Sequence, residues 1–177
     1  MTTAVVVVLL STGVPAFSAL IKNNRLETED YALRTILSAA RSEAQTQRTT
    51  VTVCRSDNGI DCSSGNWGNG YISFIDLDTD GQLDSAEQLL EHRSQNIHGI
   101  TVSYSQAENM LRFDGNGSAV GSSGTFTFCD TQPEIEPRGL VVSVVGSLRE
   151  AVASKNGDAT SIPQDHDGNK LSCQHSP

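Results

Sequence analysis

The sequence is poor in aromatic residues, in proline and in positive charge. Phe, Trp and Tyr make up 5% of the 177 residues, and there are five prolines and two methionines. Lys and Arg number 12 against 21 Asp and Glu, which gives a formal net charge of −9. Because an acidic surface repels a phosphate backbone, this balance disfavours general nucleic-acid binding and suits calcium or basic partners better. The length is enough for one domain with a modest core.

The sequence also lacks the common catalytic motifs. It contains no G-x-S-x-G, no H-E-x-x-H, no P-loop and no G-x-G-x-x-G pattern. Its four histidines share no metal-ligand spacing, and Ser118, Ser122 and Ser123 lie among glycines, which is typical of a turn. A short acidic stretch, Asp165 to Gly168, has no downstream Glu and is interpreted as part of a solvated tail. We therefore expect a protein that is not an enzyme.

The four cysteines form neither a CxxC motif nor a spacing with histidine that fits zinc. They allow three pairings, and four reduced thiols in a cytosolic protein are the alternative. Cys54 and Cys62 flank RSDNGID, a loop rich in turn-forming residues that can bring the two thiols together. We therefore expect the disulfides Cys54–Cys62 and Cys129–Cys173, the second of which would tie the C-terminal tail to a strand.

The N-terminal segment is a long uncharged run. Residues Ala4 to Leu20 carry no charge, but 17 residues are fewer than the roughly 20 that a membrane-spanning helix needs. A buried core helix is the alternative, although Val5 to Leu10 is apolar on all sides, which favours lipid or complete burial. A cleaved signal peptide fits poorly, because no basic residues precede the run.

The uncharged run continues into an amphipathic pattern. Apolar residues recur at helical spacings, and charged residues fall between them. The predicted buried face consists of Leu26, Leu33, Ile36, Leu37, Ala40 and Ala44. The charged residues expected in solvent are Arg25, Glu29, Arg34, Arg41 and Glu43. The sequence therefore predicts one long helix that is apolar at its start and amphipathic at its end.

Short segments bounded by Gly, Asn, Asp and Ser follow the helix and are typical of strands. They are TTVTVC, YISFID, GITVSYS, NMLRF, GTFTFC and GLVVSVV. From Ala153 the chain is polar and mostly irregular. One long helix followed by strands predicts an α+β fold, in which the helix packs on a small antiparallel β-sheet.

Residues 76–87, DLDTDGQLDSAE, match the EF-hand calcium loop D-x-[DN]-x-[DN]-G-x5-E at every required position. The candidate ligands are the carboxylates of Asp76, Asp78, Asp80, Asp84 and Glu87 and the backbone carbonyl of Gln82. The flanks differ from an EF-hand, because YISFI is a strand pattern, while DSAEQLLEH is expected to form about one helical turn. The alternative is a solvated acidic hairpin turn. We expect a structural calcium site that orders a loop of mutually repelling carboxylates.

Several motifs carry a family resemblance through their order. LSAARSEAQTQR at the end of the helix leads into TTVTVCRS, and Trp67, Gly70 and Tyr71 then stand in GNWGNGYISFIDLDTDG. LRFDGNGSA, GTFTFC and RGLVVSVVGSLR follow as later strands. Over roughly residues 1 to 150 the sequence resembles the GspH/FimT family of minor type IV pilins and type II secretion pseudopilins.

The resemblance implies a type IV pilin-like fold and a structural role. Residues 1–21 would form the membrane-spanning half of the helix, 22–48 its amphipathic half, 49–152 the β-rich domain and 153–177 a polar tail. Such a subunit takes part in the priming or tip complex of a type IV pilus or a type II secretion pseudopilus, with other pilins as partners. Before assembly it crosses the inner membrane once and places its domain in the periplasm.

The resemblance also bears on the start of the chain. Type IV prepilins have a short basic leader, a Gly before the cleavage point, a methylated N-terminal Phe and a Glu early in the mature helix. The printed sequence has none of these, so we expect the natural chain to begin upstream of Met1. The missing residues would lengthen the apolar run to a full membrane span.

A DNA receptor for natural transformation is the alternative function. Some FimT-like pilins are linked to DNA uptake through basic residues late in the domain, where this sequence has PRGLVVSVVGSLRE. Arg138 and Arg149, with Lys155 beyond them, are the candidate phosphate contacts. Two or three such contacts give weak binding, and nearby acids reduce it further. These acids are Glu134, Glu136 and Glu150.

Overall fold

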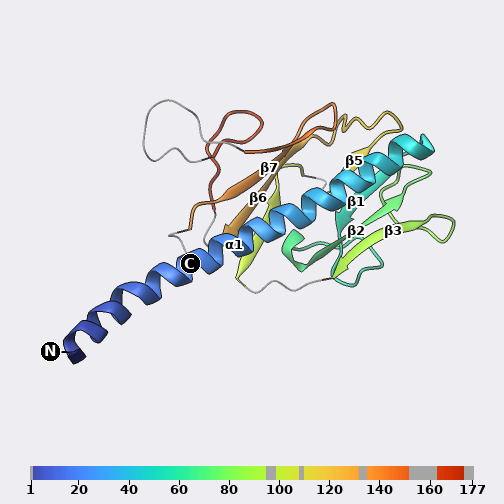
Figure 1. Cartoon of the computed structure of the whole chain (residues 1–177). Helices are drawn as coiled ribbons and strands as arrows, with labels where there is room; N and C mark the ends of the chain where they lie inside the picture. Colours follow the sequence, from blue (N-terminus) through green and yellow to red (C-terminus); the bar gives the residue numbers. More distant parts are fainter. Residues whose placement is uncertain (1, 95–98, 108–109, 132–134, 152–162, 174–177) are drawn as a thin grey trace.

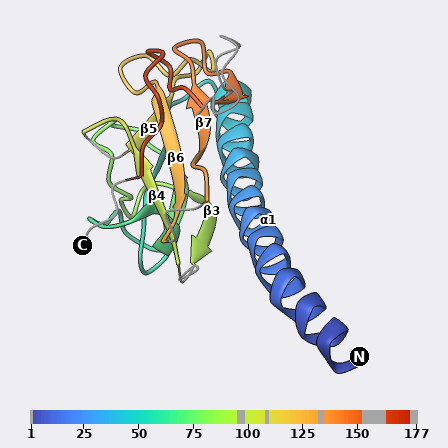
Figure 2. The same ribbon diagram turned by 90° about the vertical axis from the view of Figure 1, so that its left-hand side faces the viewer.

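The computed structural model describes residues 2–94, 99–107, 110–131, 135–151 and 163–173, and of residues 2–20 it describes the backbone alone. One helix, α1 (Thr2–Gln47), precedes all the strands. It lies along the β domain, and its N-terminal part continues beyond the strands (Figures 1 and 2). The α+β fold predicted from the sequence is confirmed.

The strands of the described residues form two antiparallel sheets of four strands each, where the sequence predicted one sheet. The first sheet has the order β3-β2-β1-β5, and its strands are β1 (Val51–Arg55), β2 (Gly70–Ile75), β3 (Leu89–Ser94) and β5 (Met110–Phe113). The second sheet has the order β4-β6-β7-β8, and its strands are β4 (Ile100–Tyr104), β6 (Gly124–Asp130), β7 (Arg138–Val142) and β8 (Leu148–Glu150). The chain thus leaves the first sheet for β4 and returns to it for β5.

All six strand segments expected from the sequence form strands, and β3 and β8 are additional. No helix forms in DSAEQLLEH. Asp84 to Glu87 make a single turn, in which the Glu87 N–H donates to the Asp84 carbonyl at 3.0 Å, and Leu89 to Ser94 form β3. Pairing with β2 supplies backbone hydrogen-bond partners along this segment and sets Arg93 opposite Tyr71. Long-range pairing of this kind overrides a local helical preference.

The predicted buried face of α1 packs against the β domain, and it contacts both sheets. Its central residues are at most 1% exposed, and Ile36 packs beside them. These buried residues are Leu26, Leu33, Leu37, Ala40 and Ala44. Each fully buried leucine contributes about 1.5–3 kcal/mol of hydrophobic stabilisation. The helix is therefore fixed to the β domain over its C-terminal half.

Near its C-terminal end, α1 is hydrogen-bonded to loops that follow strands of both sheets. Arg41 Nε donates to the Gly117 carbonyl at 2.9 Å, and Arg41 Nη2 donates to the Val145 carbonyl at 3.0 Å. Gln45 Nε2 donates to the Asn116 carbonyl at 3.1 Å. Arg41, which was expected in solvent, is therefore partly buried and holds the helix to the domain.

Glu29 was also expected in solvent, and that expectation is wrong. Glu29 is 8% exposed, and both its carboxylate oxygens lie 2.9 Å from Arg93 Nη2. Arg93 lies on the face of β3 that is turned toward α1, opposite Tyr71 of β2, so it meets the helix. Burial raises the pKa of Glu29, and the charge of Arg93 opposes that rise. The pair fixes the rotation of α1 on the first sheet.

Trp67 joins the two sheets at the centre of the core. It begins a short 3-10 helix, η1 (Trp67–Asn69), and is 1% exposed. Its ring packs edge-on against Phe126 of β6, with ring centroids 4.8 Å apart, and lies 6.3 Å from Tyr71 of β2. Edge-to-face aromatic pairs add to the stabilisation from buried area. Trp67 thus contributes to holding the two sheets together.

Each sheet has an outer face turned away from α1, and a disulfide lies on each of these faces. Cys54 on β1 is bonded to Cys62, and Cys129 on β6 is bonded to Cys173. These are the two pairs named from the sequence. The second bond holds residues 163–173 against the second sheet, where Leu171 packs with Val141 and Ala151.

Several predicted segments lie outside the described residues. Within the part of the chain that the structure describes, no helix is both long and apolar enough to cross a membrane. The side chains of the apolar run, Ala4 to Leu20, are not among those described. Residues 153–162 and 174–177 of the C-terminal tail also lie outside the description, as do His98 and His175.

Candidate metal centre

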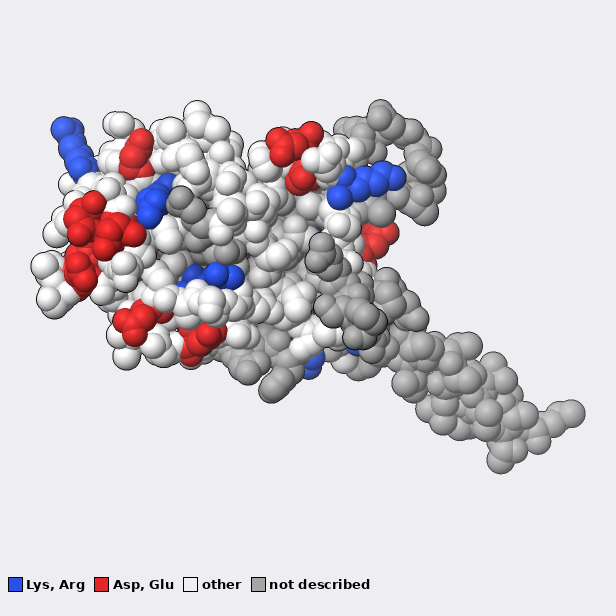
Figure 3. Space-filling model, turned by 180° about the vertical axis from the view of Figure 1, so that it is seen from behind, with Lys and Arg blue, Asp and Glu red and all other residues white. Residues whose placement is uncertain are grey.

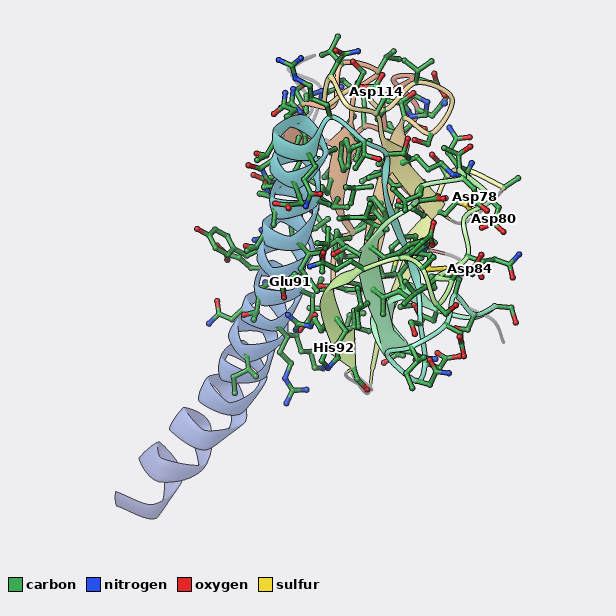
Figure 4. The ribbon with its side chains drawn as sticks, turned by 90° about the vertical axis from the view of Figure 1, so that its right-hand side faces the viewer. Asp78, Asp80, Asp84, Glu91, His92 and Asp114 are labelled. Atoms are coloured by element: carbon green, nitrogen blue, oxygen red, sulfur yellow. A yellow bond between two sulfur atoms is a disulfide. The ribbon has the colours of Figure 1, made fainter. Side chains whose placement is uncertain are left out.

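Residues 76–87 connect β2 to β3 on the outer face of the first sheet. Side chains alternate along a strand, and Asp76 continues the series of β2 residues that faces away from α1. Its backbone N–H donates to the Thr50 carbonyl at 3.0 Å, which attaches the start of the loop to the strand next to it. Asp78, Asp80 and Asp84 lie on the side of the domain away from α1 (Figure 4).

Asp76 is a fully buried carboxylate, and only one of its oxygens is hydrogen-bonded to a described residue. It is 0% exposed. Its Oδ2 accepts a hydrogen bond from Thr52 Oγ1 at 2.5 Å and lies 3.7 Å from Arg112 Nε. Its Oδ1 is buried and has no hydrogen-bond partner among the described residues. The carboxylate is therefore held in position from one side and keeps unused acceptor capacity on the other.

The next two aspartates bring their carboxylates to the same place. Asp78 Oδ1 accepts from the Asp80 backbone N–H at 3.1 Å, and Asp80 Oδ1 accepts from the Gln82 backbone N–H at 2.7 Å. One carboxylate oxygen from each of Asp76, Asp78 and Asp80 lies within 4.8 Å of the other two. The structure thus gathers three of the six ligand residues that the sequence named.

The later candidates are placed differently. Glu87 Oε1 accepts from the Leu77 backbone N–H at 2.7 Å, and Glu87 Oε2 accepts from the Asp84 backbone N–H at 3.1 Å. The nearby charge of Asp80, followed by burial and the charges of Asp78 and Glu87, raises the pKa of Asp84. The negative charges of Asp78 and Asp80 therefore act on Asp84. Both oxygens of Glu87 are instead hydrogen-bonded to backbone N–H groups of the loop.

Gly81 allows the loop to lie tightly against the first sheet. Its φ of +80° belongs to the left-handed region that favours glycine. A methyl group at this position would lie 2.6 Å from Arg112 Nη2 and 2.7 Å from Met110 Sδ. The Gly81 carbonyl oxygen is 3.3 Å from the sulfur of Cys62. The loop is thus supported by β5 and by the first disulfide.

Two residues of this site, Thr52 and Arg112, were not identified from the sequence. They are directly paired across β1 and β5, and both lie on the outer face of the first sheet. The alternation of TTVTVC, with Val51 and Val53 in the core, is the signal that places Thr52 on that face. No comparable local signal identifies Arg112, because its role depends on the pairing of β5 with β1.

A second group of acidic residues lies on the outer face of the second sheet. Ligand atoms of Asp165, His166 and Asp167 lie within 4.8 Å of one another. Asp165 Oδ1 accepts from the backbone N–H groups of Asp167 and Asn169, at 2.9 and 2.8 Å. Burial would raise the pKa of Asp165, but these bonds, a bond from the Asn169 side chain and the charge of His166 together lower that pKa below its ordinary value. The acceptor capacity of Asp165 is thus used within its own turn.

The two arginines considered for DNA contact are not brought together. Arg138 lies 3.5 Å from Glu27 of α1 and 3.6 Å from Glu150 of β8. Arg149 is exposed and pairs with Val141 of β7, an odd number of residues from Arg138, so the two arginines lie on opposite faces of the sheet. Glu134 and Lys155 lie outside the described residues.

Among the described residues, the side chains on the face drawn in Figure 3 form no basic stripe. Lys and Arg side chains are scattered there, and Asp and Glu side chains form several groups. Because non-specific DNA affinity grows with the number of phosphates neutralised, scattered cations bind weakly.

One continuous N-terminal helix that lies along a small antiparallel β domain is the arrangement of a pilin. The chain matches the family described as type II transport protein GspH over residues 32–147 and belongs to that family. The matches are to structural pilin subunits rather than to enzymes.

The fold is similar to that of the type IV minor pilin FimU from Pseudomonas aeruginosa strain PAO1. In one crystal form the TM-score is 0.59 at 23% identity, and the alignment covers 74% of this chain and 91% of FimU. In a second crystal form the TM-score is 0.55 at 23% identity, with 70% and 90% covered. No curated protein matches the sequence.

Proposed function

We propose that this protein is a minor pilin or pseudopilin that takes part in assembling a type IV pilus or a type II secretion pseudopilus, as a member of a priming or tip complex. The observation that carries the proposal is α1. It is a single helix of 46 residues, and its described buried positions run from Leu26 to Ala44. The part before them continues beyond the β domain (Figure 2).

The apolar and amphipathic parts of the helix fit two successive states of the subunit, the membrane-inserted form and the assembled filament. Before assembly, the apolar run Ala4 to Leu20 holds the subunit in the inner membrane, with the domain in the periplasm. In the filament, the same run packs among the helices of neighbouring pilins. The two disulfides support a periplasmic domain, because such bonds persist in oxidising compartments.

Exposed apolar residues on the domain provide lateral contacts in this proposal. Val120, Val144 and Val145 are 71%, 54% and 65% exposed. The two loops that carry them are joined by a hydrogen bond from the Ala119 N–H to the Val144 carbonyl at 2.8 Å. Exposed apolar groups that lie together mark surfaces for protein contacts. A neighbouring subunit is the partner that this proposal assigns to them.

The proposal is tested by deleting the gene in the source bacterium and measuring surface pili, type II secretion and transformation in the same cultures. We expect loss of pili or of secretion, with transformation falling only where pili fall. Complementation with Val144→Asp/Val145→Asp should restore less assembly than the matched control Val144→Thr/Val145→Thr. Normal pili and normal secretion after deletion would contradict the proposal.

The same cultures distinguish the DNA-receptor alternative. A receptor predicts normal pili with lost transformation, and it predicts that Arg138→Ala/Arg149→Ala fails to restore transformation. Because Arg138 is paired with two glutamates and Arg149 lies on the opposite face, we expect the double variant to transform like wild type.

A further inference from the structure

We propose that residues 76–87 bind one Ca²⁺ ion, with Asp76, Asp78 and Asp80 as ligands already gathered and Glu87 as the ligand that completes the site. The proposal goes beyond the assembly role and does not depend on it. The ligand class is a hard divalent cation, which prefers carboxylate and carbonyl oxygens.

The buried oxygen of Asp76 is the observation that carries this proposal. A carboxylate oxygen that is buried without a partner costs free energy, and such atoms in folded proteins call for an explanation. Thr52 and Arg112 both approach Oδ2, so Oδ1 is the oxygen left over. Their contacts also fix the orientation of the carboxylate. Asp76 is thus a preorganised ligand with one oxygen available for an ion.

The spacing of the three carboxylates fits a shared calcium ion. Calcium binds oxygens at 2.3–2.6 Å, so two oxygens on one ion lie at most about 5.2 Å apart. The ligand oxygens of Asp76, Asp78 and Asp80 all lie within 4.8 Å of one another, which satisfies this limit. Their present spacing is therefore compatible with one shared ion.

A small cation fits this arrangement better than a basic segment of a partner protein does. Asp78 and Asp80 are exposed, and either of them can pair with a lysine or arginine from outside. Asp76 is 0% exposed, so a bulky guanidinium or ammonium group cannot reach it without opening the loop. An ion smaller than a water molecule can bridge the buried carboxylate and the two exposed ones.

Glu87 must exchange partners in order to complete the site. Both of its oxygens accept backbone hydrogen bonds, one from Leu77 and one from Asp84. Both of these donors lie on an exposed loop, where water can replace the lost bond. This exchange reduces the net gain on binding. We therefore expect a dissociation constant of about 10⁻⁴–10⁻³ M, the range of extracellular calcium modules.

The experiment uses the full chain in detergent micelles, freed of divalent ions by EGTA and dialysis. Calorimetric titration measures Ca²⁺ binding directly, and thermal unfolding is followed with Ca²⁺, with Mg²⁺ and with EGTA. Asp80→Asn removes one ligand charge and keeps the oxygen that accepts from Gln82. Asp167→Asn is the matched control, because it removes an exposed aspartate from the other acidic turn.

We expect one Ca²⁺ per chain and a rise in Tm of about 3–6 °C at ten times the dissociation constant. Binding should weaken at least tenfold in Asp80→Asn and change less than twofold in Asp167→Asn. Mg²⁺ should raise the Tm less than Ca²⁺ does, because it demands shorter bonds in octahedral geometry. If Asp80→Asn does not fold, Asp78→Asn takes its place with the same expectation.

Two results would overturn the proposal. One is wild-type protein that shows neither heat of binding nor a Tm shift at about 10 mM Ca²⁺, ten times the weakest expected constant. The other is equal weakening in Asp80→Asn and Asp167→Asn, which would point to diffuse attraction by the acidic surface. Neither result bears on pilus assembly, so the two proposals fail separately.

Discussion

The two sheets of this protein have the same layout, but the aspartates of their acidic turns differ in burial and in hydrogen bonding. Each sheet has four antiparallel strands, α1 on its inner face, and a disulfide and an aspartate-rich turn on its outer face. On the second sheet, Asp165 accepts hydrogen bonds from two backbone N–H groups of its own turn. On the first sheet Asp76 is buried and hydrogen-bonded through one oxygen, and its other oxygen has no partner among the residues that the structure describes. The proposed Ca²⁺ site on the first loop therefore differs from the second turn in having unused acceptor capacity on a buried carboxylate.

The largest expected difference between the two faces is in the stability that each disulfide contributes. In the chain-entropy description, a bond stabilises more when it closes a longer loop. Cys129–Cys173 spans 44 residues and Cys54–Cys62 spans 8. Replacing both cysteines by serine should therefore cost about 4 kcal/mol for the first pair and about 2.5 kcal/mol for the second. Urea unfolding in EGTA measures both costs.

The same variants connect stability to ion binding. Loss of Cys54–Cys62 removes the support behind the Gly81 carbonyl and should weaken Ca²⁺ binding as well. Loss of Cys129–Cys173 should leave Ca²⁺ binding unchanged. Equal costs for the two pairs, or a larger cost for the shorter loop, would contradict the loop-length argument.

A smaller difference is expected in the stability lost when the glycine of each acidic turn is replaced by alanine. Gly81 and Gly168 have nearly the same backbone angle, φ of +80° and +84°. An alanine at either position costs about 1–2 kcal/mol because of the left-handed conformation. At Gly81 the added methyl also meets Arg112 and Met110, whereas at Gly168 none of the described residues has an atom within 4 Å of it. Because these atoms are the ends of two flexible side chains that can move aside, overpacking at Gly81 adds at most about 1 kcal/mol.

Chemical unfolding of Gly81→Ala and Gly168→Ala checks this difference. We expect Gly81→Ala to lose slightly more stability and also to bind Ca²⁺ more weakly, since the Arg112 and Met110 side chains that support the loop must shift to accept the methyl group. A loss in Gly168→Ala as large as that in Gly81→Ala would mean that backbone conformation alone sets the cost at both positions.

The smallest expected effects concern pH and have opposite signs on the two faces. The pKa of Asp165 is lowered in the folded protein, so it contributes stability above its unfolded pKa, and this contribution is lost as pH falls through the folded pKa. The pKa of Asp84 is raised, so its contribution is present at low pH and is lost as pH rises through the folded pKa.

Stability measured against pH in EGTA separates these two carboxylates. At neutral pH, Asp165→Asn should be less stable than wild type, and the difference should shrink as pH falls below 4. Asp84→Asn should be slightly more stable than wild type at neutral pH, because it relieves repulsion from Asp80. Shifts of the same sign in both variants would contradict the opposite pKa shifts of Asp84 and Asp165.

The sequence predicted those features that depend on local periodicity. The buried face of α1 follows from apolar residues at helical spacing. The six predicted strands follow from short segments typical of strands that are bounded by turn-forming residues. The turn that gathers Asp78 and Asp80 is equally local, because each carboxylate accepts from a backbone N–H two residues away.

Features that depend on pairing between distant segments were not predictable in this way. β3 forms because β2 offers it a partner, and only β3 brings Arg93 to Glu29. Arg112 reaches Asp76 because β5 pairs with β1 after the chain has built β4 in the other sheet. The separation into two sheets follows from this crossing, which local sequence pattern does not encode.

The attachment of α1 through Arg41 has a mechanical consequence. A subunit pulled by the start of its helix transmits tension along the helix axis to the domain. Near its far end, the helix is bonded to the Gly117 loop after β5 and the Val145 loop after β7, which belong to different sheets. Tension on the helix would therefore reach both sheets through these two bonds, and resistance to such forced unfolding is set by the unfolding rate rather than by equilibrium stability.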